Sequence, residues 1–308
     1  MKTLTIEQYT EKYRDRPAQN AAPAEAEAAD FHLPRRELVS HKYSYGRALV
    51  IAGARGYAGA PALAANACER SGAGLTQLMT PESVYPVAAA RCDGAVVTPL
   101  PETEQGGVSP DAIPVILGAL QKADACVIGP GLGTGAEPVV QAVLQACTCP
   151  LVLDADALRA CTAEAFAARR APLLLTPHEG EFKRMGGVLT DGRLAGALRF
   201  TQAHPGAILI LKGYGTLVCR DGEVSVNPTG GPAMAKGGSG DVLCGVLCAL
   251  LAQGFDPWLA ARCAVWLHGL SGDLCARELG EYSVTPGDMI RRLPEAFLSL
   301  QENPCFPS

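Results

Sequence analysis

The stretch PLVLDADAL, residues 150–158, contains a short apolar run that ends at an aspartate. Apolar runs of about five residues, closed by Gly, Pro or Asp, are typical of strands that are covered on both faces of a parallel sheet. Five other runs have the same form and are predicted as strands: 47–53, 75–80, 125–131, 172–178 and 207–213. Helical stretches separate them, among them 59–74 and 137–148. Strands that alternate with helices predict an α/β fold with a mostly parallel sheet and helices on both faces.

Four of the predicted strands carry glycine or polar residues at their carboxyl ends. These ends are Gly129-Pro130-Gly131, Asp154-Ala155-Asp156, Pro177-His178 and Lys212-Gly213. Ligands of open α/β sheets bind at the carboxyl ends of the strands, so we expect the four ends to line one crevice. Beyond them, TLVCRDGEVSVNP (216–228) contains two alternating runs joined by Asp221-Gly222, which predicts a hairpin at the edge of the sheet.

The composition excludes several classes of protein. Of 308 residues, 48% are hydrophobic and 19% are charged, and the net charge is -5, which is typical neither of a nucleic-acid-binding protein nor of a disordered chain. No apolar run approaches the roughly 20 residues that span a bilayer, and MKTLTIEQYTEKYRDRP lacks the apolar core of a signal peptide. The 12 cysteines include no C-x-x-C pair. We therefore expect a cytoplasmic protein with free thiols that binds neither nucleic acid nor membrane.

Residues 1–33 differ in composition from the rest of the chain. A polar segment leads into AAPAEAEAAD (21–30), which is typical of a loose helix or a linker. We predict that residues 1–33 are an N-terminal extension, whose role the sequence leaves open. Residues 34–303 are predicted to form a single domain, because one open α/β sheet can reach this size.

The stretch NPTGGPAMAKGGSGDVLCGVLCALLAQG (227–254) joins a glycine cluster to an apolar run with helical spacing. Gly237, Gly238 and Gly240 flank Ser239, and glycine lets backbone N–H groups approach a ligand closely. The helix that follows places its positive end at the same point. Residues Gly237, Gly238, Ser239 and Gly240 are therefore predicted to form a nest that binds an anion.

Asp241 is expected at the start of this helix. It is either the N-cap, a position that Asp fills well, or a functional carboxylate. The density of glycines favours the second reading, because an ordinary cap needs no nest. A carboxylate beside an anion site suits phosphoryl transfer: the nest holds the migrating group, and Asp241 accepts the proton of the attacking hydroxyl. We expect the helix dipole to keep this carboxylate ionised.

Other motifs are excluded or left open. GPGLGTG (129–135) lacks the spacing of a dinucleotide fingerprint, the Gly-Lys dipeptide of a Walker A loop does not occur, and HEGEF is not the zinc motif HExxH. His178 is either a ligand contact or a strand-end histidine bound by backbone groups, and Glu181 is either functional or part of a solvated helical turn. Asp154 and Asp156 either cap the next helix or help to hold a hydrated Mg²⁺.

A series of motifs, each of them unspecific alone, occurs in a fixed order along the chain: HKYSYGRALVIAGARGYAGAPALAA, VIGPGLG, LVLDADAL, LLLTPHEGEF, LKGYGT, NPTGGPAMAKGGSGDVLCG and AVWLHGLSGDL. Together they resemble the successive motifs of the ADP/ATP-dependent NAD(P)H-hydrate dehydratases, which are carbohydrate-kinase-like repair enzymes. The resemblance covers about residues 34–300. It implies a ribokinase-like fold, in agreement with the predicted strands.

The resemblance implies repair of the S form of NADH hydrate or NADPH hydrate, in which water has added to the nicotinamide ring. Transfer of a phosphoryl group from ADP or ATP, with Mg²⁺, would turn the hydroxyl into a good leaving group, and the ring nitrogen can then expel phosphate. The resemblance also implies a homo-oligomer. It ranks neither NADH hydrate against NADPH hydrate nor ADP against ATP, although the single-domain form looks like the ADP-using type. No protein ligands for a metal are predicted.

The site residues follow from the matching motifs. Asp241 resembles the catalytic residue that contacts the hydrate hydroxyl, and Gly240 resembles a nucleotide contact. The loop that binds the adenine nucleotide is implied to be Lys212, Gly213, Tyr214, Gly215 and Thr216. The hydrate pocket is implied to include Ala60, Gly131, Gly133 and His178.

The chain departs from the family pattern at Gly231 and Ala233, where many members have asparagine and glycine, so any role of that asparagine is in doubt. Two alternatives to the dehydratase remain. One is a small-molecule alcohol kinase of the same fold, such as a vitamin-precursor kinase, and the other is a nucleotide-sensing module without catalysis. The order of LDADAL and TPHEGEF favours the dehydratase, and the intact Asp241 argues against a sensing module.

Overall fold

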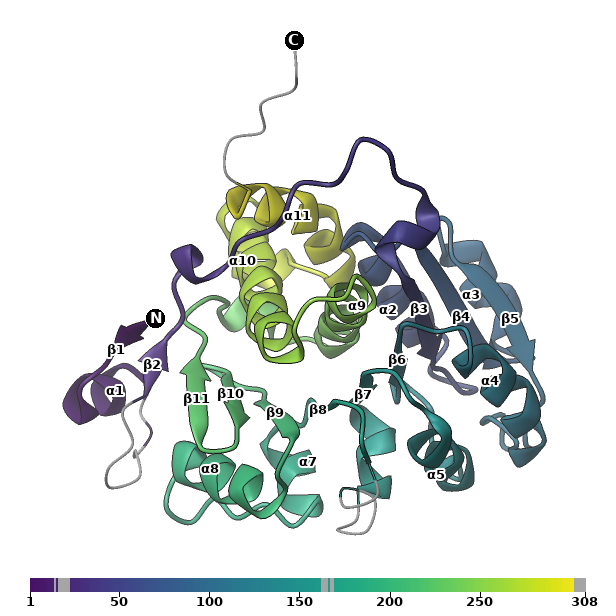
Figure 1. Ribbon diagram of the computed structural model, residues 1–308, viewed down its shortest axis with the longest axis horizontal. Coiled ribbons are helices and arrows are strands. Elements are labelled where there is room, and N and C mark those ends of the chain that lie inside the picture. Colours follow the sequence, from purple (N-terminus) through teal and green to yellow (C-terminus); the bar gives the residue numbers. More distant parts are fainter. Residues whose placement is uncertain (14, 16–22, 162–165, 167–168, 302–308) are drawn as a thin grey trace.

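The computed structural model describes residues 1–13, 15, 23–161, 166 and 169–301. In this part of the chain, eleven strands form one mixed sheet in the order β1-β2-β11-β10-β9-β8-β7-β6-β3-β4-β5 (Figure 1). The strands are β1 (Lys2–Thr3), β2 (Ala24–Glu25), β3 (Arg47–Ile51), β4 (Leu75–Pro81), β5 (Val96–Leu100), β6 (Ala125–Ile128), β7 (Leu151–Leu153), β8 (Leu173–Leu175), β9 (Ala207–Leu211), β10 (Leu217–Arg220) and β11 (Glu223–Val226).

The six strands predicted from apolar runs are confirmed as the parallel centre of the sheet, β3, β4, β6, β7, β8 and β9. Their side chains alternate between two cores. In β7, Leu151 and Leu153 pack into one core and Val152 packs into the other, and all three are fully buried. Because both faces of the sheet are covered, the sequence shows continuous apolar runs where a one-sided sheet would show alternation.

The predicted hairpin is confirmed, but its predicted place at the edge of the sheet is wrong, because β2 and β1 lie beyond β11. β10 pairs antiparallel with both β9 and β11. Its turn residues, Asp221 and Gly222, have φ angles of 47° and 88°. A tight hairpin turn requires positive φ at both central positions, and the Asp-Gly sequence supplies it.

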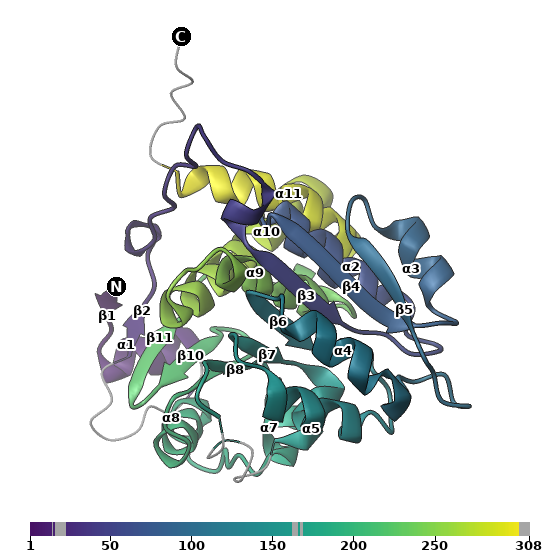
Figure 2. The same ribbon diagram turned by 45° about the vertical axis from the view of Figure 1, so that its right-hand side comes forward.

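Helices cover the two faces of the sheet, so the fold is a three-layer α/β arrangement (Figures 1 and 2). One core contains residues of α2 (Gly59–Arg70), α3 (Tyr85–Arg91), α9 (Ser239–Ala252), α10 (Pro257–Ser283) and α11 (Pro286–Ser299). The other core contains residues of α1 (Ile6–Tyr13), α4 (Ile113–Leu120), α5 (Glu137–Ala146), α7 (Glu179–Arg184) and α8 (Arg193–Ala203).

Helix α9 packs tightly against α2. A side chain on Gly245 of α9 would lie only 2.2 Å from the backbone oxygen of Ala64 in α2. The two backbones can approach this closely because Gly245 has no Cβ. This contact fixes the amino end of α9, which carries the glycine cluster, over the central strands (Figure 2).

Two parts of the sheet were not predicted. β5 contains Pro99, which interrupts its pattern, and Pro is tolerated there because β5 is an edge strand. Ala24 and Glu25 form β2, which pairs parallel with β11, and η1 (Ala28–Asp30) follows. The loose helix or linker predicted for residues 21–30 is therefore wrong at Ala24 and Glu25, whereas Ala28–Asp30 form a short helical turn. Residues 21, 22, 302 and 303 lie outside the described residues.

Two further observations bear on the sequence analysis. Within the described ranges, no helix combines the length and the apolar composition needed to cross a bilayer. The cysteines found in the same ranges are all free thiols, and most of them are buried. Cys305 lies outside the described residues.

Candidate active site

The carboxyl ends of β6, β7, β8 and β9 lie side by side, because these strands are parallel neighbours. At the end of β6, Gly129 has a φ of +138°, and a side chain on it would lie 1.9 Å from the Asp154 backbone oxygen. Only glycine permits this approach of the two strand ends. His178 and Lys212, beyond β8 and β9, form a parallel bridge. The four strand ends are thus neighbours, but only the ends of β8 and β9, with His178, Lys212 and Gly213, line the cavity described below.

Asp154 and Lys212 form a buried ion pair at these strand ends. Lys212 Nζ lies 2.8 Å from Asp154 Oδ1, and Thr176 Oγ1 donates a 2.7 Å hydrogen bond to the same oxygen. Burial alone would raise the pKa of Asp154, but the charge of Lys212 and the hydrogen bonds from Lys212 and Thr176 hold it below its ordinary value. Burial also opposes the charge of Lys212, yet Asp154 and Glu181 raise its pKa. Both partners are therefore charged at neutral pH.

Asp241 is a half-buried carboxyl in the first turn of α9, and the N-cap of that helix is Gly238. The reading of Asp241 as a simple N-cap is therefore wrong. Burial, and secondly the neighbouring Asp154, raise the pKa of Asp241 to about 7, with Lys212 acting in the opposite direction. The sequence predicts that the helix dipole keeps Asp241 ionised; with its pKa near 7, the carboxyl is only partly ionised at neutral pH. A carboxyl with a pKa near neutrality can accept a proton and release it again.

The glycine cluster forms the amino end of α9 and faces the ion pair. Gly238 has a φ of +97°, a left-handed conformation that favours glycine. Ser239 Oγ donates a 2.8 Å hydrogen bond to the Met234 backbone oxygen, so this hydroxyl points into the protein. A side chain on Gly240 would lie 3.3 Å from Lys212 Nζ. The N–H groups of a first helical turn have no partner within the helix, and together with Lys212 they offer a place for an anion.

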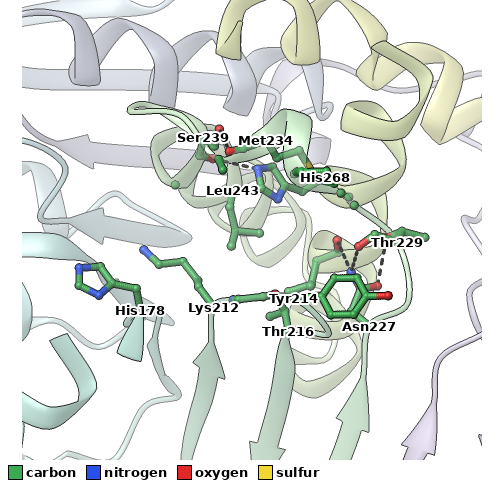
Figure 3. Close-up of a pocket in the computed structure, with 18 of the residues that line it drawn as sticks. His178, Lys212, Tyr214, Thr216, Asn227, Thr229, Met234, Ser239, Leu243 and His268 are labelled. Atoms are coloured by element: carbon green, nitrogen blue, oxygen red, sulfur yellow. Dashed lines mark hydrogen bonds between the residues drawn. The ribbon is translucent and has the colours of Figure 1, made fainter. Parts of the chain in front are cut away.

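A cavity of about 550 Å³ opens beside the ion pair (Figure 3). Its size is typical of a small-molecule site. The predicted residues that line it are His178, Lys212, Gly213, Tyr214, Thr216, Ser239 and Gly240. Four other predicted site residues are next to these lining residues in the sequence. Among the described residues, these four do not line the cavity: Gly215, Gly237, Gly238 and Asp241.

The cavity also contains residues that the sequence analysis did not single out, namely Asn227, Thr229, Leu243, Val265 and His268. Asn227 Nδ2 donates a 2.9 Å hydrogen bond to the Thr229 backbone oxygen, and Thr229 Oγ1 donates one of 2.9 Å to that of Trp266. These bonds fasten the segment after β11 to α10. Asn227 stands in a motif quoted above, but its second acceptor, the Val265 backbone oxygen at 3.3 Å, is 38 positions away in the sequence.

His268 holds the backbone of the nest. Its Nε2 lies 2.8 Å from the Ser239 backbone oxygen (Figure 3). Burial lowers the pKa of His268 to about 4, so the ring is neutral at physiological pH. A neutral ring can donate its Nε2–H to the Ser239 oxygen. His268 occurs in the quoted motif AVWLHGLSGDL, which is the signal that could have identified it.

The residues that the motifs assign to the hydrate pocket fall into two groups. A side chain on Gly131 would lie 3.2 Å from Ala60 Cβ, so these two residues are neighbours, and Gly133 N donates a 2.9 Å hydrogen bond to Asp156 Oδ2. His178 lines the cavity beside Lys212 instead. The His178 ring is 55% exposed, and its Nδ1 accepts 2.9 Å from Gly180 N. The reading of His178 as a histidine bound by backbone groups is confirmed for this nitrogen.

The nest contacts both groups. A side chain on Gly238 would lie 2.7 Å from Leu63 Cδ1, in the helix α2 that also carries Ala60. On its other side, Gly240 faces Lys212 and the cavity. Asp241 follows directly in the chain. This arrangement places the Asp241 segment between the cavity and the region around Ala60.

Asp154 and Asp156 lie at the start of η4 (Ala155–Ala160), where the sequence leaves open whether they cap the helix or help to hold a hydrated Mg²⁺. Asp154 precedes η4 but makes no side-chain cap, since it pairs with Lys212. Asp156 accepts from Gly133 and pairs with Arg159 at 3.3 Å. In the part of the chain that the structure describes, no three His, Cys, Asp or Glu side chains form a group that could hold a metal by themselves.

The fold and the site together define an α/β protein of the ribokinase-like class, and solved ribokinase-like structures share the fold. The family model of NAD(P)H-hydrate dehydratase matches residues 48–295, which is most of the chain. The chain therefore belongs to the NAD(P)H-hydrate dehydratase family.

Individual relatives agree with this assignment. The bifunctional NAD(P)H-hydrate repair enzyme of Moorella thermoacetica is 39% identical over 88% of this chain and 52% of its own length. The ADP-dependent (S)-NAD(P)H-hydrate dehydratase of Lactiplantibacillus plantarum is 33% identical over 88% of this chain and 95% of its own. The chain spans about half the length of the bifunctional curated relatives that it matches.

A solved structure shows the same similarity. The ADP/ATP-dependent NAD(P)H-hydrate dehydratase of Bacillus subtilis, co-crystallised with ATP/Mg²⁺, is 32% identical to this chain. The two folds align with a TM-score of 0.78 over 92% of this chain and 100% of the other.

Proposed function

We propose that this protein is an ADP- or ATP-dependent (S)-NAD(P)H-hydrate dehydratase, which restores NADH and NADPH from their hydrates. The observation that carries the proposal is Asp241, a half-buried carboxyl at the amino end of a helix, with its pKa raised to about 7. A general base works best with a pKa near the operating pH, and the helix end beside Lys212 suits a phosphoryl group. Family membership supports the same activity.

We assign the cavity to the nucleotide and the region around Ala60 to the nicotinamide hydrate. The loop Lys212–Thr216 and Gly240 would contact the nucleotide, while Ala60, Gly131 and Gly133 would contact the hydrate. His178 lines the cavity beside Lys212, so it would contact the hydrate where the hydrate meets the phosphates of the nucleotide. The reacting atoms would then meet at Asp241, between the two regions.

Phosphoryl transfer begins at the hydrate hydroxyl. Asp241 takes the hydroxyl proton while the oxygen attacks the terminal phosphorus, and the P–O bond to the departing AMP or ADP breaks. The N–H groups of the nest, residues Gly237, Gly238, Ser239 and Gly240, would stabilise the phosphoryl oxygens together with Lys212. His268 and Asp154 keep the nest backbone and the lysine in place.

Elimination completes the repair. The lone pair of the ring nitrogen expels phosphate, which leaves far more readily than hydroxide, and a proton is lost from the adjacent ring carbon. The oxygen of the added water thus leaves in inorganic phosphate. With ADP as donor, the hydrate and ADP become the reduced cofactor, AMP and phosphate.

Mg²⁺ fits this site as an ion that arrives with the nucleotide. Mg²⁺ usually keeps several waters and binds through phosphates with one or two carboxylates, so it needs no cage of protein ligands. The carboxylates beside Lys212 are Asp154, at 2.8 Å, and Glu181, at 3.9 Å. Neither of them lines the cavity, so the phosphates and water would hold the ion, which would supply positive charge to the phosphates.

The test is recovery of the reduced cofactor, measured as absorbance at about 340 nm. Purified protein is mixed with NADH hydrate or NADPH hydrate, Mg²⁺ and either ADP, ATP or no nucleotide. We expect recovery only with a nucleotide, and the better nucleotide identifies the phosphoryl donor. A stable phosphorylated product without recovery would replace this proposal with the alcohol kinase. Failure with every nucleotide, from folded protein that binds ADP, would overturn it.

Two further properties belong to the proposal. We propose a cytoplasmic location, supported by the free thiols of the described cysteines, which suit a reducing compartment. We also propose a homo-oligomer, in which exposed apolar side chains such as Leu38, Val39 and Tyr282 would be covered by a second copy. Light scattering on the purified protein measures the number of chains per particle.

A further inference from the structure

The N-terminal segment reaches the wall of the cavity that we assign to the nucleotide. We call residues 1–13, 15 and 23–30 the N-terminal arm, which lies beside β11 and α8 (Figure 1). Three separate contacts connect this arm to the cavity. Tyr13 and Asp15 act on the loop Lys212–Thr216, and β2 pairs with β11, the strand that leads into the cavity.

Tyr13 packs directly against the loop. A side chain on Gly215 would lie 2.3 Å from Tyr13 Cδ1, so the Tyr13 ring lies on the Gly215 backbone, which has a φ of +62°. The rings of Tyr13 and Tyr214 are 5.8 Å apart between centroids. Tyr13 is 5% exposed, whereas Tyr214 is 61% exposed and lines the cavity. The buried ring of Tyr13 therefore lies behind the exposed ring of Tyr214, which lines the cavity.

Asp15 connects the arm to the loop through α8. The N-cap of α8 is Gly192, which has no side chain to cap the helix. Asp15 fills that role, accepting 2.8 Å from Arg193 N and 3.1 Å from Leu194 N. The Arg193 side chain in turn donates 2.7 Å to the Tyr214 backbone oxygen and 3.2 Å to that of Leu211. Asp15 thus fixes the residue that holds the loop backbone.

The third contact is the pairing of β2 with β11. Ala26 N donates 2.9 Å to the Val226 backbone oxygen, and the next residue, Asn227, lines the cavity. Glu25 of β2 accepts a 2.6 Å hydrogen bond from the Tyr13 hydroxyl. The strand pairing therefore anchors Tyr13 in its position against the loop.

We propose that the N-terminal arm forms the outer wall of the nucleotide site, with Tyr13 and Asp15 as positioning residues that hold Tyr214 as a platform for the adenine base. This inference rests on the assignment of the cavity to the nucleotide. An aromatic ring at a cavity rim stacks on nucleobases, and such stacking tolerates any orientation of the rest of the ligand. A ring that is already held in place loses less conformational entropy when the base binds.

The test separates the base from the phosphates of the ligand. Binding of ADP, of ATP and of inorganic tripolyphosphate, which has no base, is measured by calorimetry on the full chain. We expect Tyr13→Leu and Asp15→Asn to weaken ADP and ATP roughly five- to tenfold, which is part of the range for one stacked base, and to leave tripolyphosphate unchanged. Tyr13→Phe keeps the ring but loses the hydrogen bond to Glu25, so it should weaken ADP binding less than Tyr13→Leu does.

Kinetics and a double variant distinguish positioning from general destabilisation. We expect Tyr13→Leu to raise the KM for the nucleotide while kcat and the KM for the hydrate stay within about twofold, since the effect is on stacking. In the Tyr214→Ala background, Tyr13→Leu should cause no further loss of ADP binding, because Tyr13 acts through Tyr214. Asp30→Asn is the matched control: it weakens the arm's ion pair with Arg262 and does not touch the loop.

Each other outcome decides against the inference or against the proposed function. Equal losses for ADP and tripolyphosphate, or unchanged ADP binding in the Tyr13→Leu and Asp15→Asn variants, would overturn the role of the arm. Wild-type protein that binds ADP but repairs no hydrate would overturn the dehydratase and leave the arm's role standing. Wild-type protein that binds no adenine nucleotide would overturn both.

Discussion

The strand ends contribute a buried carboxylate and the amino end of α9 a half-buried one to the same site, and the two carboxylates behave in opposite ways. Asp154, at the end of β7, pairs with Lys212 and accepts from Thr176, and its pKa lies below the ordinary value. Asp241, in the first turn of α9, has its pKa raised to about 7. Burial pushes both pKa values upward, so burial does not account for the difference.

The difference comes from the partners. Asp154 has a cation within hydrogen-bond distance, and the favourable interaction outweighs its desolvation. Asp241 is desolvated as well, but the charge that raises its pKa further is Asp154 itself. Two carboxyls whose environments drive their pKa values apart mark the division of roles in many active sites. Here Asp154 suits a permanently charged anchor and Asp241 suits a proton acceptor.

The largest expected effect is on catalysis at Asp241. We expect Asp241→Asn to lower kcat by about 10²–10⁴-fold, because the amide cannot accept the hydroxyl proton. Asp156→Asn is the matched control, since Asp156 contacts Gly133 and Arg159 and does not take part in proton transfer. Steady-state kinetics with saturating nucleotide measure the change. An Asp241→Asn protein with nearly full activity would remove the distinction between the two carboxylates.

The second effect is on stability at the anchor. Lys212→Met leaves Asp154 buried without its cation, and we expect a loss of about 3–5 kcal/mol in the free energy of unfolding. Urea denaturation measures it, with Lys236→Met as control, because Lys236 is exposed and donates only to the Tyr282 backbone oxygen. Replacing both partners, Lys212→Met with Asp154→Leu, should recover much of the loss. If Lys212→Met alone were as stable as the wild type, the Lys212–Asp154 ion pair would not contribute to stability as expected.

A third, smaller effect is the stability cost of Asp241 itself. Its pKa rises from 3.8 in the unfolded chain to about 7 in the folded protein, so stability from this group is present below pH 3.8 and is lost as the pH rises to about 7. We therefore expect Asp241→Asn to be more stable than the wild type by about 1–3 kcal/mol at pH 8. This is a fraction of the free energy that corresponds to the full difference between the two pKa values. Thermal unfolding at pH 8 and at pH 4 measures this. A gain of the same size at both pH values would point to another cause.

The smallest effect is a shift of the pH profile. If Asp241 is the base, kcat/KM should rise with pH through about 7 and then level off. Asp154→Asn removes the like charge and leaves the positive charge of Lys212 beside Asp241, so the rising limb should move to lower pH. An unmoved limb in this variant would show that Asp154 does not set the pKa of Asp241.

Much of the fold could be predicted from the sequence. The strand β7 was recognisable because Leu151, Val152 and Leu153 are all apolar, which only a strand covered on both faces requires. The hairpin was recognisable from Asp221-Gly222 because few other dipeptides tolerate its backbone. In contrast, β2 has two residues, too few for any pattern, and it exists because β11 offers an open edge for pairing.

The site was predicted as a set of residues but without its internal relationships. Lys212, Gly240 and Asp241 were found from glycine density and from motif order. The ion pair between Lys212 and Asp154 could not be predicted in this way, because the two residues are 58 positions apart in the sequence. Asn227 and His268 were missed for the same reason, since their role depends on partners that only folding brings near.

The sequence by itself determined which residues can carry the chemistry: a glycine-rich helix start, one acid beside it, and buried strands with polar ends. These follow from local rules of backbone freedom and periodicity, which act over a few residues. The tertiary structure decided the protonation of Asp241, the pairing of Asp154 and the contact of Tyr13 with Gly215. Desolvation, charge proximity and packing depend on three-dimensional distance, and spacing along the chain does not encode that distance.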